Sequence, residues 1–131
     1  MRQHILLVLL AVASARTASA ADAGGPQRAM YLRYCGACHG PGGKGDGIAG
    51  SFMRPKPPDL TQIAKQSGGT FPLKKVMRYV DGTDDVRAHG DPDMPVWGEV
   101  FRDQSGDATR RAEVQGKLLL ITEYLQSIQE H

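Results

Sequence analysis

The strongest periodic pattern of apolar residues lies near the end of the sequence. From about Ala112 to Gln129, apolar side chains recur at alternating spacings of four and three residues. That spacing places them on one face of an α-helix, which has about 3.6 residues per turn. The pattern therefore predicts a helix over residues 112–129. Its buried face consists of Val114, Leu118, Ile121, Leu125 and Ile128.

Two shorter segments also have helical patterns. Residues 26–35 place Met30, Tyr31 and Tyr34 on one side of a helix. A second helix starts near Leu73, has apolar residues at i, i+3, i+4 and i+7, and is expected to end at Asp81-Gly82. No segment has the strict alternation of a strand. We therefore expect an all-α fold of about three to four helices and long loops.

Segments rich in Gly, Pro and Asp separate the predicted helices. They comprise residues 40–62, GPGGKGDGIAGSFMRPKPPDLTQ, and residues 81–100, DGTDDVRAHGDPDMPVWGEV. Loops of this length in a small domain are usually functional or disordered. Three modest helices form only a thin core, so we expect something else to fill the middle of the domain.

Residues 1–20 have the layout of a secretory signal peptide. They contain Arg2, an apolar run over residues 5–12 and small residues before Ala20. The run is too short to span a bilayer. The alternative, an uncleaved anchor helix, is disfavoured because polar residues soon interrupt the run. We expect cleavage after Ala20 and an exported domain over residues 21–131.

The net charge carries little information once this segment is removed, but the distribution of charge is uneven. Without residues 1–20, acidic and basic residues are equal in number, so nothing indicates nucleic-acid binding. Residues 54–78 contain six basic residues and one aspartate, whereas residues 81–93 contain five aspartates and one arginine. Such a pattern either steers a charged partner or is simply a solvated surface.

The two cysteines of the chain stand three residues apart and are followed directly by a histidine, in Cys35-Gly36-Ala37-Cys38-His39. This C-x-x-C-H pattern is the attachment signature of c-type haem. At helical spacing both sulfurs lie on one face, where each adds to one vinyl group, and His39 is placed to bind the iron.

A disulfide or a zinc site is the alternative interpretation of this motif. A Cys35–Cys38 disulfide suits an exported chain but leaves His39 unexplained. A zinc site needs two ligands besides the cysteines, and after residue 20 only His39, His89 and His131 are available, without paired spacing. Covalent haem is therefore the better interpretation.

The stretch YCGACHGPGGKGDGIAG, followed by KPPDL, DMPVWGEV and ITEYLQSI, resembles a class I monohaem cytochrome c of the bacterial periplasmic type. The resemblance extends over essentially the whole chain after residue 20. It implies helices wrapped around one covalently bound haem c, with a histidine and a methionine on opposite faces. It also implies that Tyr31 faces Ile121 and Tyr124. The family often has glycine eight residues before its first cysteine, where this chain has Gln27.

The methionine ligand has to be chosen among several candidates. Met94 lies in a loop 55 residues after His39, and Pro95 holds the chain extended there, so its sulfur can reach the far face of the haem. Met53 and His89 are the alternatives. Met30 precedes Cys35 by five residues on the same helix, so it cannot easily reach the opposite haem face, and Met77 is expected in the core.

The resemblance implies a periplasmic electron carrier rather than an enzyme. Its partners would be redox proteins: a dehydrogenase or membrane respiratory complex, and a terminal oxidase or reductase. Nucleic acid is not expected as a partner, nor a transmembrane segment after signal cleavage. The chain is alternatively a haem c subunit of a periplasmic dehydrogenase complex. A further alternative is a ligand-binding or peroxidatic haem protein with a labile Met94, in which His89 and Arg87 are candidate groups.

Overall fold

The structure is a computed structural model, and it describes residues 24–83, 94–104 and 110–130. All regular secondary structure in these ranges is helical, which confirms the all-α prediction. The predicted signal peptide, Arg87 and His89 lie outside the described residues. The elements are α1 (Gly25–Tyr34), α2 (Gly36–His39), η2 (Ala49–Phe52), η3 (Leu60–Gln62), α3 (Ile63–Gln66), α4 (Leu73–Asp81), α5 (Trp97–Gln104) and α6 (Arg110–Ser127).

The three helices predicted from apolar periodicity are present as α1, α4 and α6. Helix α4 ends as expected, because Gly82 takes the left-handed conformation with φ 83° and its N–H bonds to the carbonyl of Arg78 at 2.9 Å. Helix α5 lies where the sequence predicted a loop. With α5, the described residues form four helices of eight or more residues, and α2 and α3 add single turns.

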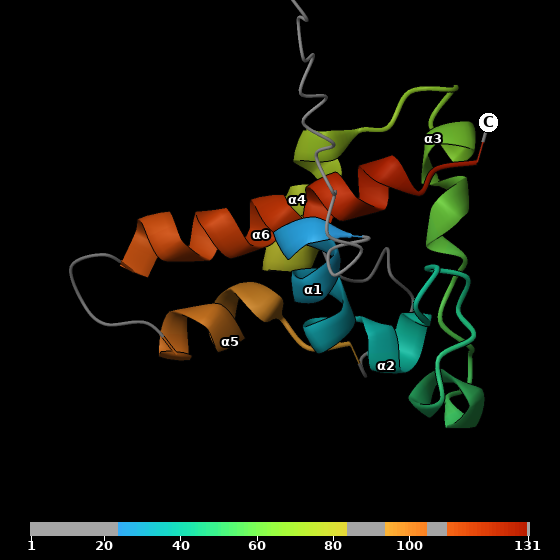
Figure 1. Ribbon diagram of the computed structural model, residues 1–131, viewed down its shortest axis with the longest axis horizontal. Helices are drawn as coiled ribbons and strands as arrows, with labels where there is room; N and C mark the ends of the chain where they lie inside the picture. The colour runs from blue at the N-terminus through green and yellow to red at the C-terminus, as the bar shows by residue number, and fades with distance from the viewer. Residues whose placement is uncertain (1–23, 84–93, 105–109, 131) are drawn as a thin grey trace, which may run out of the picture.

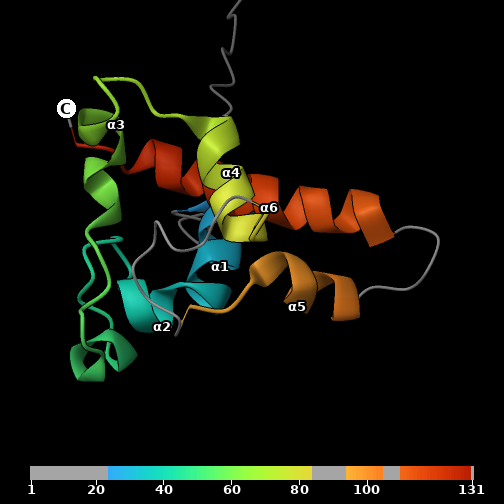
Figure 2. The same cartoon turned by 180° about the vertical axis from the view of Figure 1, so that it is seen from behind.

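Helix α6 is the element on which the other long helices pack. Helix α1 crosses in front of it in Figure 1 and α4 crosses in front of it in the opposite view of Figure 2, so the two lie on opposite sides of α6. Helix α5 also packs on α6. The fully buried side chains at these contacts are Tyr31, Phe101, Leu118, Ile121 and Thr122. The apolar face predicted for residues 112–129 is therefore the centre of the core.

The crossing of α1 and α6 is made by two tyrosines. The rings of Tyr31 and Tyr124 are 4.6 Å apart between centroids, as the resemblance implied. The hydroxyl of Tyr31 donates to the carbonyl of Gly40 at 2.8 Å, and that of Tyr124 donates to the carbonyl of Pro41 at 2.9 Å. Burial raises the pKa of the Tyr31 phenol, so this hydroxyl keeps its proton and remains a donor. The crossing thereby fixes the chain directly after α2.

Gln27, where the family often has glycine, fits at the same crossing. Its side chain is only partly buried, and its amide donates to a carboxylate oxygen of Glu123 on α6 at 3.2 Å. The amide therefore spans the two helices at the edge of the crossing, and the aromatic contact behind it is kept.

The segment that follows α6 is attached to the irregular part of the chain. The Gln129 amide donates to the carbonyl of Leu60 at 2.9 Å, and its oxygen accepts from the N–H of Ala64 at 2.8 Å. The N–H of Glu130 donates to the carbonyl of Thr61 at 2.9 Å. These three bonds hold residues 60–64 against the end of α6.

Adjacent leucines on α6 provide a test of this arrangement. Leu118 is fully buried, whereas Leu119 is 39% exposed. We expect Leu118→Ala to lower the free energy of unfolding by about 3 kcal/mol, because it leaves a cavity between α6 and its neighbours. Leu119→Ala, the control, should change it by less than about 0.5 kcal/mol. Guanidinium denaturation measures both, and equal losses would contradict the packing described.

Candidate functional site

Two adjoining cavities lie between α2, α4, the start of α5 and the irregular segment after Met53. The larger has a volume of about 470 Å³, within the range of roughly 300–1,000 Å³ typical of small-molecule sites. Both cavities are lined mainly by apolar side chains. The residues that line both are Cys35, His39, Lys56, Pro58 and Met94. The two cavities therefore share a common set of walls and together form one hollow.

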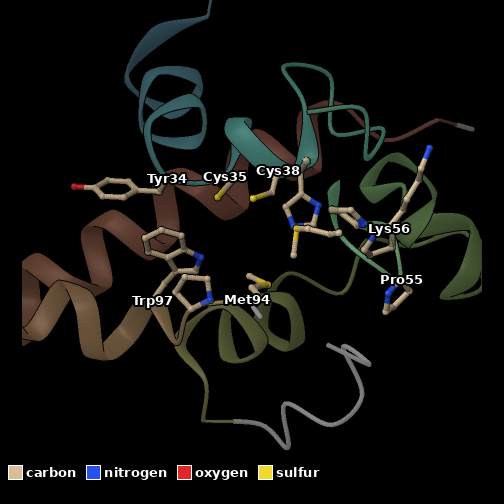
Figure 3. Close-up of a pocket in the computed structure, with 12 residues that line it drawn as sticks. Tyr34, Cys35, Cys38, Pro55, Lys56, Met94 and Trp97 are labelled. Atoms are coloured by element: carbon tan, nitrogen blue, oxygen red, sulfur yellow. The ribbon is translucent and has the colours of Figure 1, made fainter. Parts of the chain in front are cut away.

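The turn of α2 supplies one wall. Cys35 is the residue before α2, Cys38 lies within it and His39 is its last residue. The N–H groups of Cys38 and His39 both bond to the carbonyl of Cys35, at 3.2 and 2.9 Å, so the predicted helical spacing is present. Figure 3 shows Cys35 and Cys38 pointing into the hollow from this turn. Cys35 and His39 are buried, at 7% and 8% exposure.

The protonation of the thiols bears on whether Cys35 and Cys38 form a redox-active disulfide. Burial raises the pKa of the Cys35 thiol to about 12, and the neighbouring Cys38 contributes to the same shift. At neutral pH Cys35 is therefore the protonated thiol, whereas redox-active cysteines have a lowered pKa. Both cysteines are free. The structure thus gives no support to a redox-active Cys35–Cys38 disulfide.

The zinc alternative is also without support in the part of the chain described. Among residues 24–83, 94–104 and 110–130, no three or more histidine, cysteine, aspartate or glutamate side chains converge in a group able to hold a metal ion. His89 and His131, the other histidines considered as ligands, lie outside these ranges.

The wall opposite α2 carries Met94. In Figure 3 this side chain lies across the hollow from Cys35 and Cys38. Met53 also lines the hollow, but only the cavity that holds Cys38 and Trp97. The two methionines of the predicted helices, Met30 and Met77, are packed against the core instead, as expected for Met77.

Close packing of α4 against the start of α5 holds Met94 in place. Asp81 is buried at the end of α4, and Arg102 on α5 donates to its carboxylate at 3.2 Å. A Cβ atom added to Gly98 would overlap the carboxylate and the carbonyl of Asp81. Glycine therefore lets the two helices approach closely four residues after Met94.

An aromatic cluster backs the wall on the α5 side, and the sequence interpretation missed it. The ring centroids of Tyr34 and Trp97 are 5.4 Å apart, those of Tyr34 and Phe101 are 4.8 Å apart, and those of Trp97 and Phe101 are 5.8 Å apart. The available signal was the spacing of Trp97 and Phe101, which is i, i+4 on a short helix. Edge contacts of this kind stabilise aromatic pairs beyond simple burial.

Glycines bring the irregular segment directly onto α2. A Cβ atom on Gly47 would overlap the carbonyl of Ala37, and one on Gly50 would overlap the carbonyl of Cys38. Prolines follow in the same segment and line the hollow, at positions 55, 57 and 58. The third wall is thus apolar and stiff, because proline fixes its own backbone φ angle.

The donor atoms and the surface around them fit a covalently bound haem. Two thiols and an imidazole share one wall, a thioether sulfur faces them, and proline and aromatic surfaces enclose the space between. Haem c uses thiols for attachment and an imidazole with a thioether as axial ligands of the iron. The chemistry of the site is therefore that of a protein that binds haem.

Comparison with models of protein families gives a match to the one described as Cytochrome c, over residues 27–109. The chain belongs to the cytochrome c family, whose members bind haem c covalently, and it is a haem c electron-transfer protein. Comparisons with curated proteins and with solved structures gave no match. Within the described residues, no helix is both long enough and apolar enough to cross a membrane.

Glycine substitutions test the close packing beside Met94. We expect Gly98→Ala to lower the free energy of unfolding by about 1–3 kcal/mol, because the added methyl group must push α5 away from Asp81. Gly116→Ala on α6 is the matched control, since a Cβ atom there meets no atom within 4 Å. It should stabilise the protein by about 1 kcal/mol through helix propensity. Denaturant unfolding distinguishes the two, and a neutral Gly98→Ala would contradict the packing described.

Proposed function

We propose that the chain is a periplasmic electron carrier with one haem c, attached at Cys35 and Cys38 and ligated by His39 and Met94. The observation that carries this proposal is that all four side chains line one hollow. Membership of the cytochrome c family supports the cofactor and the kind of reaction.

Attachment would use the two sulfurs of the α2 turn. Cys35 and Cys38 would each hold the porphyrin through one thioether, in which the S–H would have added across a vinyl group, sulfur to carbon and hydrogen to the other carbon. The position of Cys35 and Cys38 on one helical turn suits two such links. The tyrosine bonds to Gly40 and Pro41 hold this turn in place from α1 and α6.

Two observations favour Met94 over Met53 as the second ligand of the iron. Met94 lines both cavities together with His39, whereas Met53 lines only one of them. Met94 also precedes a helix that is fixed by Asp81 and Gly98, so its position is set by packing. His89, the other alternative, lies outside the described residues.

A carrier role follows from such a ligand set. Bound haem c supplies a one-electron couple between ferric and ferrous iron, and a methionine ligand favours the ferrous state relative to a second histidine. The protein's part is to hold His39 and Met94 in place in both oxidation states and to keep the site apolar. If His39 and Met94 both hold the iron, no position would be left for a substrate, which supports a carrier over an enzyme.

The visible spectrum, with carbon monoxide as a probe, tests the ligand assignment. We expect the purified protein to contain covalent low-spin haem that does not bind carbon monoxide in the reduced state, because both axial positions are filled. Met94→Leu should open one position and make the reduced protein bind carbon monoxide. Met53→Leu, the matched control at a methionine that lines the same hollow, should leave the spectrum unchanged. Both swaps nearly conserve volume, so stability should fall by less than about 1.5 kcal/mol.

The reverse pattern would assign the ligand to Met53. A wild-type protein that binds carbon monoxide would favour the ligand-binding or peroxidatic alternative. A colourless protein made in a host that attaches haem c would overturn the proposal.

Export is proposed on the layout of residues 1–20. The donor would then be a dehydrogenase or a membrane respiratory complex, and the acceptor a terminal oxidase or reductase. Expression in a Gram-negative host with haem-attachment machinery should give a periplasmic protein that begins at Ala21, as measured by mass spectrometry of the intact chain. A protein retaining residues 1–20 in the membrane fraction would indicate the uncleaved anchor instead.

A further inference from the structure

We propose that Ile48 and Phe52, with Arg54 and Lys56 beside them, are the docking surface for a redox protein whose own docking face has an apolar centre bordered by carboxylates. We call these four residues the η2 surface. The inference rests on the proposed function, because docking here serves electron transfer only if haem c occupies the adjoining hollow.

The exposure of the two apolar side chains is unusual for this protein. Ile48 is 85% exposed and Phe52 is 82% exposed. Among the described residues, the only other exposed large apolar side chain is Leu119, at 39%. Single exposed apolar residues need no explanation, but two at either end of one short turn form a patch that water solvates poorly. Such patches commonly mark sites of protein association.

The packing of η2 on α2 explains why these side chains face outward. Gly47 and Gly50 are three residues apart and both lie against the backbone of Ala37 and Cys38. Both glycines are buried, so the side of the turn that carries them is the one in contact with α2. Both Figure 1 and Figure 2 show this turn beside α2. The larger side chains of the turn are left on the outside.

Hydrogen bonds within the turn fix its shape before any partner binds. The hydroxyl of Ser51 donates to the carbonyl of Ile48 at 2.7 Å. The guanidinium of Arg54 donates to the carbonyls of Ser51 and Met53, at 3.0 and 2.7 Å. A surface that is already ordered loses little conformational entropy on binding, which suits brief association.

The charges beside the apolar pair select the partner. Arg54 and Lys56 are both exposed, and neither forms an ion pair with any residue that the structure describes. Asp46 is an exposed acidic residue that precedes the turn in sequence, whereas Arg54 and Lys56 follow it. Arg54 and Lys56 therefore leave a net positive border on the side nearest the hollow. Carboxylates on the partner would complement that border and speed the encounter at low salt.

The position of the η2 surface relative to the hollow gives it a role in electron transfer. Met53, Pro55 and Lys56 follow Phe52 directly in sequence and line the cavity that contains Cys38. In Figure 3, Pro55 and Lys56 lie at one side of that cavity. A partner seated on Ile48 and Phe52 would therefore be next to the mouth of the cavity. A small contact area of this kind is typical of redox encounters.

Electron exchange with a coated electrode tests the proposal on the haem-loaded protein. The electrode carries a mixed monolayer of thiols that end in methyl and carboxylate groups, which imitates the proposed partner face. We expect Phe52→Ser and Ile48→Ser each to lower the exchange rate by about tenfold, as loss of a central contact residue does. Leu119→Ser, which also removes an exposed apolar side chain, is the matched control and should exchange at the wild-type rate.

The basic border is tested on the same electrode by changing the salt concentration. The wild-type rate should fall as salt rises, and Lys56→Gln should weaken that dependence. Lys65→Gln, an exposed lysine on α3, is the control and should keep it. Visible spectra and reduction potentials of the variants at positions 48, 52, 65 and 119 should match the wild type, because these side chains are exposed and line neither cavity.

Three results would overturn the docking surface. The first is a wild-type rate in both serine variants at positions 48 and 52. The second is an equal loss in Leu119→Ser. The third is sedimentation of the wild type with phosphatidylglycerol–phosphatidylcholine vesicles that Phe52→Ser abolishes, which would assign the patch to a membrane surface. Each of these results leaves the haem spectrum normal, whereas failure of the proposed function removes or alters that spectrum, so the two failures are distinguishable.

Discussion

The contact between Tyr31 on α1 and Tyr124 on α6 is the constraint on which the site depends. Their rings pack together in the core, and their hydroxyls reach past it to the carbonyls of Gly40 and Pro41. One pair of side chains therefore joins the helix crossing to the turn that carries both thiols and the imidazole. If the crossing shifted, the α2 wall of the hollow would shift with it. Neither tyrosine is among the residues proposed to hold the haem.

Much of this arrangement could be predicted from the sequence, because it depends on local spacing. The repeat of apolar residues defined α6 and α4, and the C-x-x-C-H spacing placed Cys35 and Cys38 on one turn. The resemblance to cytochromes c correctly implied that Tyr31 meets Tyr124. In each case the pattern lies within one helix or follows from a motif, and burial of an apolar face then determines the packing.

The walls of the hollow could not be predicted in the same way. Helix α5 is short, begins after Met94-Pro95 and contains Gly98, so proline and glycine obscured its periodicity. The irregular segment has no periodicity at all, and its course depends on glycines that fit against backbone carbonyls far away in sequence. The aromatic cluster of Tyr34, Trp97 and Phe101 likewise joins two elements that nothing in the sequence relates.

One wall of the hollow is anchored by Gln129, a residue near the end of the sequence. Its amide is bonded to the carbonyl of Leu60, which lies 69 positions earlier in the sequence. Since a polypeptide is made from its amino terminus, the segment with Cys35 and Cys38 emerges long before the residue that anchors residues 60–64. In the complete fold Cys35 is buried, and residues 60 and 63 line the same cavity as Cys35. A large planar group would therefore reach the Cys35 thiol more easily before residues 60–64 are anchored than afterwards.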